Sequence, residues 1–168
     1  TFKPVWTFAT KGGPGNVNNV AAPAVVGKYL QVGTTAGYYY VLDRETGAVV
    51  REIDCQEPIF SAPAARSIGV SPVRVYFATL GAKVYAVEPD GEIAWTWDFV
   101  REVVDFQGNR WSGEDWLEER GGRVDWKDHF VSSRDICLVG KMVVMPAGGR
   151  TVFLEDTGPA PKLVVAAE

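Results

Sequence analysis

A repeated run of strand-like segments is the feature that most restricts the fold of this chain. Residues 22–26 (APAVV) recur as residues 62–66 (APAAR), and each copy leads into an extended run, a small-residue step and a second extended run. Each copy then reaches a turn rich in Asp, Glu, Pro or Thr that ends in Gly. Such residues close hairpins, because Gly accepts positive φ and Asp or Thr bonds the local backbone. Each unit is therefore predicted to be a four-stranded antiparallel meander.

The spacing of the turns is typical of propeller blades. The turn residues Asp43 and Glu88 lie about 45 residues apart, the length of one blade. A third copy leads to a turn at Gly158 after an unlike segment. We predict an all-β fold, a partial β-propeller of about three four-stranded antiparallel blades with one long insertion containing a short helix. The single propeller segment 1–168 divides into an outer strand and loop (1–20), blades at 20–54, 58–99 and 131–168, and the insertion at 100–130.

The turns also share a sequence pattern with a known repeat. That repeat reads alanine, any residue, aspartate, two of any residue, threonine, glycine, three of any residue and tryptophan. The first copy keeps Asp43, Thr46 and Gly47, the second keeps Gly91 and Trp95, and the third keeps the turn glycine. The chain thereby resembles the PQQ-like family of β-propellers, named for pyrroloquinoline quinone enzymes, over about three quarters of its length.

The resemblance implies structural roles for the matching residues. In this family the blade tryptophan docks between neighbouring blades, which implies turn and docking roles for six positions. These are Asp43, Thr46, Gly47, Gly91, Trp95 and Gly158. The family includes quinone-dependent alcohol dehydrogenases and non-catalytic propellers such as a bacterial outer-membrane assembly lipoprotein, so the resemblance implies an extracytoplasmic setting more strongly than an activity.

Composition excludes several other classes of protein. The net charge of −4 and the scattered Lys and Arg residues are unsuited to binding nucleic acid. No apolar stretch is long enough for a membrane-spanning helix. The first residue is Thr1, so we expect a processed or trimmed chain from which any signal peptide has been removed.

The two cysteines admit two interpretations. Cys55 and Cys137 form no C-x-x-C motif, which excludes a zinc ribbon, a thioredoxin-type pair and c-type haem attachment. They are either two small buried apolar residues or one disulfide between neighbouring blades, and the disulfide requires an oxidising compartment.

The insertion contains the residues that are most individual to this chain. Ser112 followed by Asp115 is typical of a helix N-cap and Gly121 of a helix end, which predicts a helix over 113–120 with Trp116 and Leu117 facing the body.

Aromatic residues make this insertion the candidate binding segment. Trp111, Trp116 and Trp126 either fasten the insertion to the propeller or form a recognition surface. His129, the only histidine, completes the binding candidates, although a local hydrogen bond with a neighbouring Asp is the alternative for it. No catalytic, cofactor-binding or metal-binding residue is predicted, since a Ser/His/Asp relay and a G-x-S-x-G motif are both lacking.

Three functions are consistent with these sequence features. A three-blade arc is too short to close a ring, since closed propellers have roughly 4–8 blades. In addition, residues 4–8 resemble the fourth strand of a blade whose other strands lie elsewhere. We therefore expect a non-catalytic module for protein interaction or assembly in a periplasmic, secreted or cell-surface location, completing a ring with another chain or copy, without cofactor, nucleic acid or membrane span. The alternatives are a subunit or fragment of a PQQ dehydrogenase, which would bind PQQ with calcium, and a structural subunit of an extracellular filament or surface layer.

Overall fold

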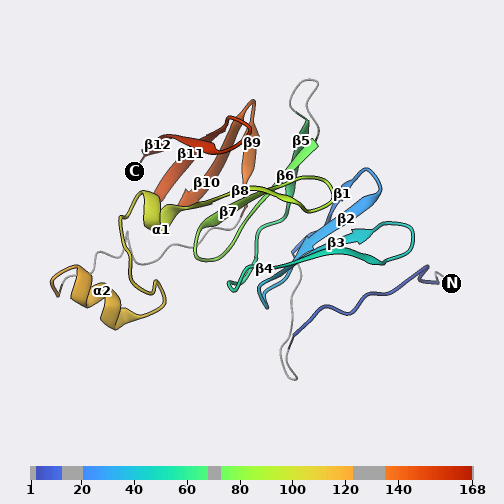
Figure 1. Cartoon of the computed structure of the whole chain (residues 1–168), viewed down its shortest axis with the longest axis horizontal. Coiled ribbons are helices and arrows are strands. Elements are labelled where there is room, and N and C mark those ends of the chain that lie inside the picture. Colours follow the sequence, from blue (N-terminus) through green and yellow to red (C-terminus); the bar gives the residue numbers. More distant parts are fainter. Residues whose placement is uncertain (1–2, 13–20, 68–72, 123–134, 168) are drawn as a thin grey trace.

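Three four-stranded antiparallel sheets form the body of the computed structural model (Figure 1). The structure describes residues 3–12, 21–67, 73–122 and 135–167. In each sheet the strands lie side by side in chain order, as in a propeller blade. The prediction of an all-β partial propeller with about three blades is confirmed.

The strands are assigned to three blades, named here in chain order. Blade 1 consists of β1 (Ala24–Val26), β2 (Tyr29–Gly33), β3 (Tyr38–Asp43) and β4 (Val49–Asp54). Blade 2 consists of β5 (Ala64–Ser67), β6 (Val73–Ala78), β7 (Lys83–Val87) and β8 (Ile93–Asp98). Blade 3 consists of β9 (Cys137–Val139), β10 (Met142–Ala147), β11 (Arg150–Asp156) and β12 (Pro161–Ala167).

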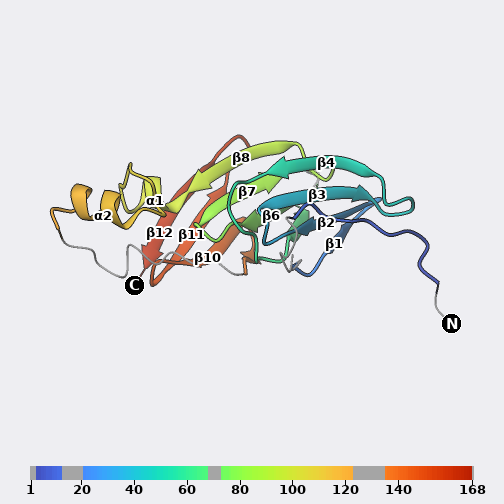
Figure 2. The same ribbon diagram turned by 90° about the horizontal axis from the view of Figure 1, so that it is seen from below.

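The blades are held together by apolar clusters between their faces. Figure 2 shows the sheets following one another in chain order, with the insertion helices toward the end of the arc opposite the N-terminus. Tyr39 of blade 1 stacks on Phe77 of blade 2 at 3.8 Å between ring centroids. A larger cluster joins Tyr76 and Trp95 of blade 2 to Val143 and Met145 of blade 3. Burial of these faces supplies the main driving force for the arrangement.

Burial along the strands distinguishes the middle blade from blade 3. All residues from 75 to 79 are buried, as expected for a sheet covered on both faces. In β10 and β11, by contrast, buried and half-buried residues alternate around Val143 and Val152. Such alternation is typical of a sheet with one covered face. Blade 3 therefore has an open face.

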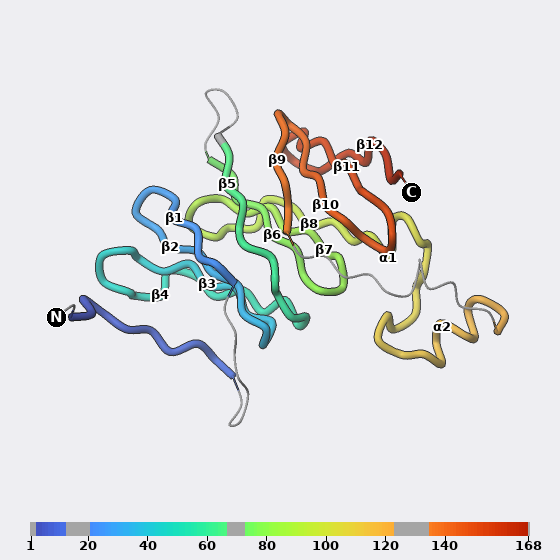
Figure 3. The backbone as a smooth tube through the Cα atoms, turned by 180° about the vertical axis from the view of Figure 1, so that it is seen from behind, coloured from blue at the N-terminus to red at the C-terminus, as the bar shows by residue number. Residues whose placement is uncertain are grey.

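Residues 3–12 cover the corresponding outer face of blade 1 (Figure 3). Phe8 packs edge-on against Tyr40 at 5.0 Å, and the Lys11 amide donates a hydrogen bond to the Tyr40 hydroxyl at 3.0 Å. Trp6 and Phe8 join a cluster with Tyr40 and Leu42, which are 0% and 2% exposed. This segment takes the place of a neighbouring blade.

A β-bulge recurs at the same place in every blade. The register shifts between Val41 and Leu42 in blade 1, and the third and fourth strands of blades 2 and 3 show the same shift. A bulge increases the local twist and redirects the following side chains. As a result Arg51, Trp95 and Val165 occupy equivalent positions on the outer strands.

Two short helices belong to the insertion. The first, α1 (Phe99–Glu102), was not predicted; the Asp98 carboxylate caps it by accepting from the amides of residues 100 and 101. The second, α2 (Gly113–Glu119), begins at Ser112 as predicted. Trp116 is 1% exposed, but the prediction that Leu117 faces the body is wrong, because it is 48% exposed. Successive helical residues point about 100° apart, so the two side chains cannot share one face.

The cysteines are free and lie in unlike surroundings. Cys55 is 3% exposed between blades 1 and 2, where burial raises the pKa of its thiol to about 12. Cys137 is exposed on β9, so the prediction of two buried residues holds only for Cys55. The alternative of a disulfide between them is not realised. No helix among the described residues has the length and apolarity to cross a membrane.

Candidate functional site

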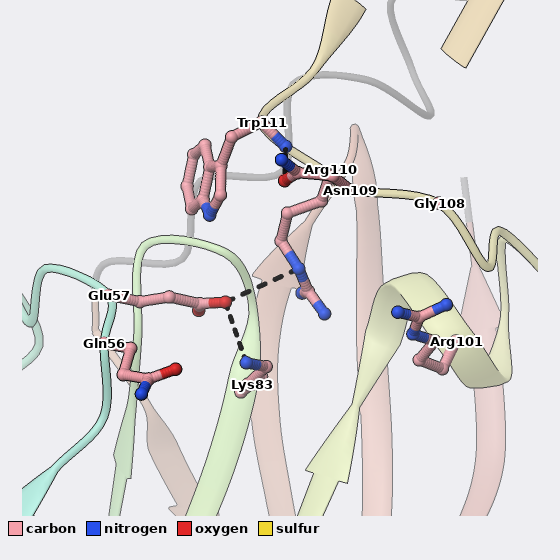
Figure 4. A pocket seen from close by; sticks show the side chains of 8 residues that line it. All are labelled: Gln56, Glu57, Lys83, Arg101, Gly108, Asn109, Arg110 and Trp111. Atoms are coloured by element: carbon pink, nitrogen blue, oxygen red, sulfur yellow. Dashed lines mark hydrogen bonds and ion pairs between the residues drawn. The ribbon is translucent and has the colours of Figure 1, made fainter. Parts of the chain in front are cut away.

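A pocket lies where the insertion meets the loops of blades 1 and 2 (Figure 4). Its volume is about 240 Å³. The lining residues are mainly polar or charged and come from three separate segments. They are Gln56, Glu57, Lys83, Arg101, Gly108, Asn109, Arg110 and Trp111.

Glu57 is the charged centre of the pocket. Its Oε1 accepts from Lys83 Nζ at 2.9 Å and lies 3.4 Å from Arg110 Nε. Its Oε2 accepts from the Thr79 hydroxyl at 2.5 Å. A carboxylate that is only 3% exposed requires such pairing. Glu57 therefore fixes a blade 2 lysine and an insertion arginine relative to one another.

Arg110 links the insertion to blade 2. Its Nη1 donates to the Gly81 carbonyl at 2.6 Å, and its Nη2 pairs with the Asp98 carboxylate. Its own carbonyl accepts from the indole Nε1 of Trp116 at 3.0 Å. Trp116 in turn stacks on Phe106 with 3.7 Å between ring centroids. Trp116 is thus a buried support for the backbone of Arg110 and does not reach the pocket surface.

Within the described part of the insertion, Trp111 is the aromatic residue most exposed to solvent. Its side chain is 55% exposed, and Figure 4 shows the indole standing over the side of the pocket occupied by Glu57. The Trp111 amide donates to Asn109 Oδ1 at 3.0 Å, which holds a local turn. The other two binding candidates, Trp126 and His129, lie outside the described residues.

Strained backbone is concentrated around this pocket. The non-glycine residues with positive φ in the described ranges are Gln56 (56°), Ala82 (60°) and Asp105 (54°). Gln56 lines the pocket, Ala82 precedes the lining residue Lys83, and Asp105 precedes the pocket loop of the insertion. Residues held in this region cost roughly 1–3 kcal/mol and cluster at functional sites. The strain therefore supports the assignment of this pocket as a site.

Carboxylates behind the pocket hold its loop in place. Glu119 accepts from the amides of Gln107 and Gly108 at 3.0 and 3.1 Å, and Asp115 accepts from the Asn109 amide at 2.8 Å. The Ser112 hydroxyl, followed by that amide, lowers the pKa of Asp115. These carboxylates line a separate hollow on the far side of Gly108. The loop is therefore held by carboxylates of the chain itself.

The residues assigned to the turns lie where one blade meets the next. In the first turn, Asp43 accepts from the Thr46 amide and hydroxyl, both at 2.9 Å, and these bonds lower the pKa of its carboxyl. Gly47 lies beneath Trp6, since a Cβ there would be 2.6 Å from the indole ring. Trp6 also donates its Nε1 to the Arg44 carbonyl at 3.0 Å.

The second turn receives Arg51 of blade 1, which stands where the first copy of the repeat would have tryptophan. A Cβ at Gly91 would lie 2.7 Å from Val41 Cγ2 and 3.0 Å from Arg51 Cδ. Arg51 donates its Nε to the Asp90 carbonyl at 3.3 Å, as Trp6 does to the first turn. Arg51 thus occupies the docking position despite its different chemistry.

At the third turn, Trp95 of blade 2 docks by a hydrogen bond to Asp156. Trp95 is 5% exposed, and its Nε1 donates to Asp156 Oδ1 at 3.2 Å. The same carboxylate accepts from Tyr76 at 2.5 Å, from Arg74 at 3.0 Å and from the Gly158 amide at 2.8 Å. Asp156 is therefore the polar centre of the contact between blades 2 and 3.

Sequence reasoning missed both charged centres. Glu57 stands outside any motif, whereas Asp156 belongs to the third turn. The Lys83 and Arg110 partners of Glu57 and the blade 2 partners of Asp156 are nevertheless far away along the chain. The only signal for Glu57 was its position in the loop between two blades, where propeller side chains converge. Across the parts of the chain that the structure describes, no group of three or more His, Cys, Asp or Glu residues is placed to hold a metal ion.

Comparison with known proteins identifies the family. A family model described as outer membrane protein assembly factor BamB matches residues 3–98. No curated protein matches the chain.

Solved structures share the fold at low sequence identity. BamB from Moraxella catarrhalis is 18% identical with a TM-score of 0.50, and the match covers 84% of this chain and 34% of that one. The designed protein Ika4 is 15% identical with a TM-score of 0.57, covering 92% and 75%. A quinohemoprotein alcohol dehydrogenase, ADHIIG from Pseudomonas putida HK5, is 18% identical with a TM-score of 0.55, covering 85% and 19%.

These matches differ in how much of each relative they span. The chain spans about a third of the BamB structure and a fifth of the dehydrogenase. At these identities the solved structures establish only the fold, whereas the family model covers more than half of the chain. The protein therefore belongs to the PQQ-repeat β-propeller family described as outer membrane protein assembly factor BamB.

Proposed function

We propose that this chain is a non-catalytic propeller module that binds another protein chain or copy, outside the cytoplasm, through the open face of blade 3. The observation that carries the proposal is a row of residues that lie directly opposite one another across the four strands of each blade. In blade 3 this row is apolar, and no further blade among the described residues covers it. Its members are Cys137, Val144, Phe153 and Val165.

The equivalent rows of the other blades contact the following blade. In blade 1 the row is Ala24, Gln31, Val41 and Arg51, and in blade 2 it is Ala64, Tyr76, Ala86 and Trp95. Gln31 donates to the Pro89 carbonyl of the next turn at 2.7 Å, and Trp95 donates to Asp156. By repetition of this geometry, the blade 3 row is the docking face for a further blade.

Exposure supports this role for the blade 3 row. Val165 is 44% exposed, whereas Trp95 at the equivalent position is 5% exposed. Cys137 is exposed, and Val144 and Phe153 are half-buried. A contiguous apolar face of this kind is a recognised mark of an interaction surface.

At the blade 1 end of the arc, residues 3–12 lack the other strands of a blade among the described residues. Residues 3–12 contact blade 1 through Trp6 as a preceding outer strand would, but no helix or strand is assigned within them. The missing inner strands of that blade would come from the partner. The partner would therefore bind at two surfaces, covering the outer face of blade 3 and pairing with residues 3–12.

The partner class and the location rest on the family. Its description names an assembly factor of outer membrane proteins, which favours a protein partner and an extracytoplasmic site. Neither a nucleic acid nor a membrane span enters the proposal.

The oligomeric state tests the proposal. We expect the chain to self-associate at micromolar concentration and Val165→Glu to shift it toward monomer, because a charge buried at an apolar contact is costly. Ile93→Glu is the matched control, since Ile93 is 45% exposed on the outer strand of blade 2. Light scattering should show discrete particles. A folded wild-type monomer that also fails to bind a separately supplied propeller fragment of the family would refute the proposal, and filaments would favour a structural subunit.

The quinone-dependent alternative gives a different result. It requires binding of PQQ with calcium, whereas the proposed module has no cofactor of its own. We expect no change in the absorbance of PQQ and no alcohol-dependent dye reduction on mixing with Ca²⁺, either by the isolated chain or by its associated form. Saturable binding by the associated form would favour the dehydrogenase subunit.

A further inference from the structure

We propose that the pocket at Glu57 and Trp111 binds a single carboxylate of a partner peptide, with Trp111 contacting the residue beside it. This site lies at the insertion and is independent of the blade 3 face. Its ligand would be an acidic side chain in an extended segment.

The charge balance of the pocket favours one negative charge. Three cations line it, Lys83, Arg101 and Arg110, and two carboxylates pair with them, Glu57 and Asp98. One unit of positive charge therefore remains in a partly enclosed space, where electrostatic interactions are stronger than in bulk water. A carboxylate neutralises that charge, whereas a phosphate dianion leaves an excess.

The engagement of the arginines also favours a carboxylate over a phosphate. Arg110 is already bonded to Gly81, Asp98 and Glu57, so its guanidinium is held in place and lines one side of the pocket. Arg101 donates through Nη1 to the Phe106 carbonyl and to Gln107 Oε1. Lys83, with 30% of its side chain exposed, pairs with Glu57, and its ammonium group carries three donors, so it is the principal cation with donors left for a ligand. One ammonium group suits a compact carboxylate better than a phosphate, which prefers several converging donors.

Trp111 supplies the apolar part of the site. An aromatic ring that is 55% exposed beside charged groups is typical of a binding hot spot. Because the Trp111 turn is held by Asn109 and the adjacent loop by Asp115 and Glu119, the ring needs little ordering on binding. The carboxylate would thus bind beside Lys83 while a neighbouring apolar side chain covers the indole.

A pair of capped, fluorescein-labelled peptides tests this inference. The first is Gly-Ser-Glu-Leu-Gly-Ser, and the second carries Gln in place of Glu, which keeps the shape and removes the charge. We expect saturable binding of the Glu peptide by fluorescence anisotropy, and affinity for the Gln peptide weaker by roughly tenfold, the effect of losing one charged hydrogen bond. Equal affinity for both peptides, or no binding of either, would overturn the proposal.

Variants of the pocket locate the binding. Trp111→Ala and Lys83→Met should each weaken binding of the Glu peptide by roughly tenfold. The matched controls are Phe60→Ala, since Phe60 is an aromatic residue 47% exposed outside the pocket, and Lys28→Met on the β1–β2 hairpin. Because Lys83→Met also removes a partner of Glu57, Arg101→Gln provides a second cation variant that leaves the Glu57 contacts in place. Loss of affinity in the controls as large as in the pocket variants would contradict the site.

Two further measurements distinguish carboxylate binding from phosphate binding and from association through blade 3. Inorganic phosphate at the peptide concentration should not displace the Glu peptide; displacement would reassign the pocket to phosphate. Val165→Glu should bind the Glu peptide like the wild type, so failure of the ring-completion proposal does not affect this one.

Discussion

At the scale of single residues, Asp156 is the group on which the contact between blades 2 and 3 depends most. Its side chain is fully buried, and it accepts hydrogen bonds from Tyr76, Trp95 and Arg74 of blade 2. Burial alone would raise its pKa, but the hydrogen bonds from Tyr76, the Gly158 amide and Trp95, together with the Arg74 charge, hold the pKa below its usual value. The carboxylate is therefore ionised in the folded protein.

Removing this carboxylate should strongly destabilise the protein. We expect Asp156→Ala to lower the free energy of unfolding by about 3 kcal/mol, because it leaves the buried Tyr76 and Trp95 donors without this acceptor and removes one of the two carboxylates that pair with Arg74. Urea unfolding measures the change. The control is Glu155→Ala, because Glu155 is the adjacent half-buried acid, and its loss should cost much less. Equal losses would show that the network contributes nothing specific.

The same carboxylate makes part of the stability depend on pH. Since its pKa is lower in the folded state, the unfolded state binds more protons in acid, and its contribution to stability falls as the pH decreases below about 4. The difference in unfolding free energy between wild type and Asp156→Ala should therefore narrow from pH 7 to pH 3. A difference that is constant over this range would contradict an ionised Asp156.

At the scale of elements, the hairpin turns act as contacts between blades as well as chain reversals. Gly91 has a φ of 86° and lies against Val41 and Arg51 of blade 1. Gly140, in the β9–β10 turn, has a φ of 55° with open space around its Cα. Both glycines therefore require positive φ, but only Gly91 is packed against another blade at the position of a Cβ.

This difference predicts unequal effects of the same substitution. Gly91→Ala and Gly140→Ala both place an L-residue at positive φ, but only Gly91→Ala also forces a methyl group against Val41. We expect Gly91→Ala to cost about 1–2 kcal/mol more than Gly140→Ala in thermal or urea unfolding. If Gly140→Ala is the more damaging change, the turn of blade 2 is not a docking contact.

At the scale of the whole molecule, the arc is asymmetric. Blade 2 is covered on both faces, and blade 1 is covered by blade 2 and by residues 3–12. Among residues 3–12, 21–67, 73–122 and 135–167, blade 3 is covered only on the side of blade 2, and its outer strand carries Leu163, Val164 and Val165 with exposures of 39%, 52% and 44%. Stability in stacked repeats comes largely from contacts between neighbours.

Hydrogen exchange should follow this asymmetry. We expect the amides of β6 and β7 to exchange most slowly and those of β12 to exchange fastest among the fourth strands of the blades, since β12 has no buried residue whereas β4 and β8 have. Mass spectrometry after proteolysis resolves these segments. Association through blade 3 should slow β12 selectively; slow exchange of β12 in a monomer would contradict the open face.

The recognisable parts of this fold were those encoded by local chemistry. The turn at Asp43 and Gly47 and the cap at Ser112 each depend on residues within a few positions, so the sequence was enough to predict them. The position of Trp95 followed from a repeat pattern. Leu117 was placed wrongly because its environment depends on how α2 meets the body, and Trp111 was identified as a candidate without its charged neighbours.

The repeat, the number of blades and the place of the insertion can all be predicted from sequence, because hairpins and caps are short-range structures. Contacts between blades cannot: the pairing of Glu57 with Lys83 and Arg110, the docking of Arg51 in a tryptophan position and the exposure of Val165 are seen only in the folded chain. These features arise from stacking of one sheet on another, which brings together residues remote along the chain. No local pattern records such contacts, since their partners are selected by distance in space rather than by spacing in sequence.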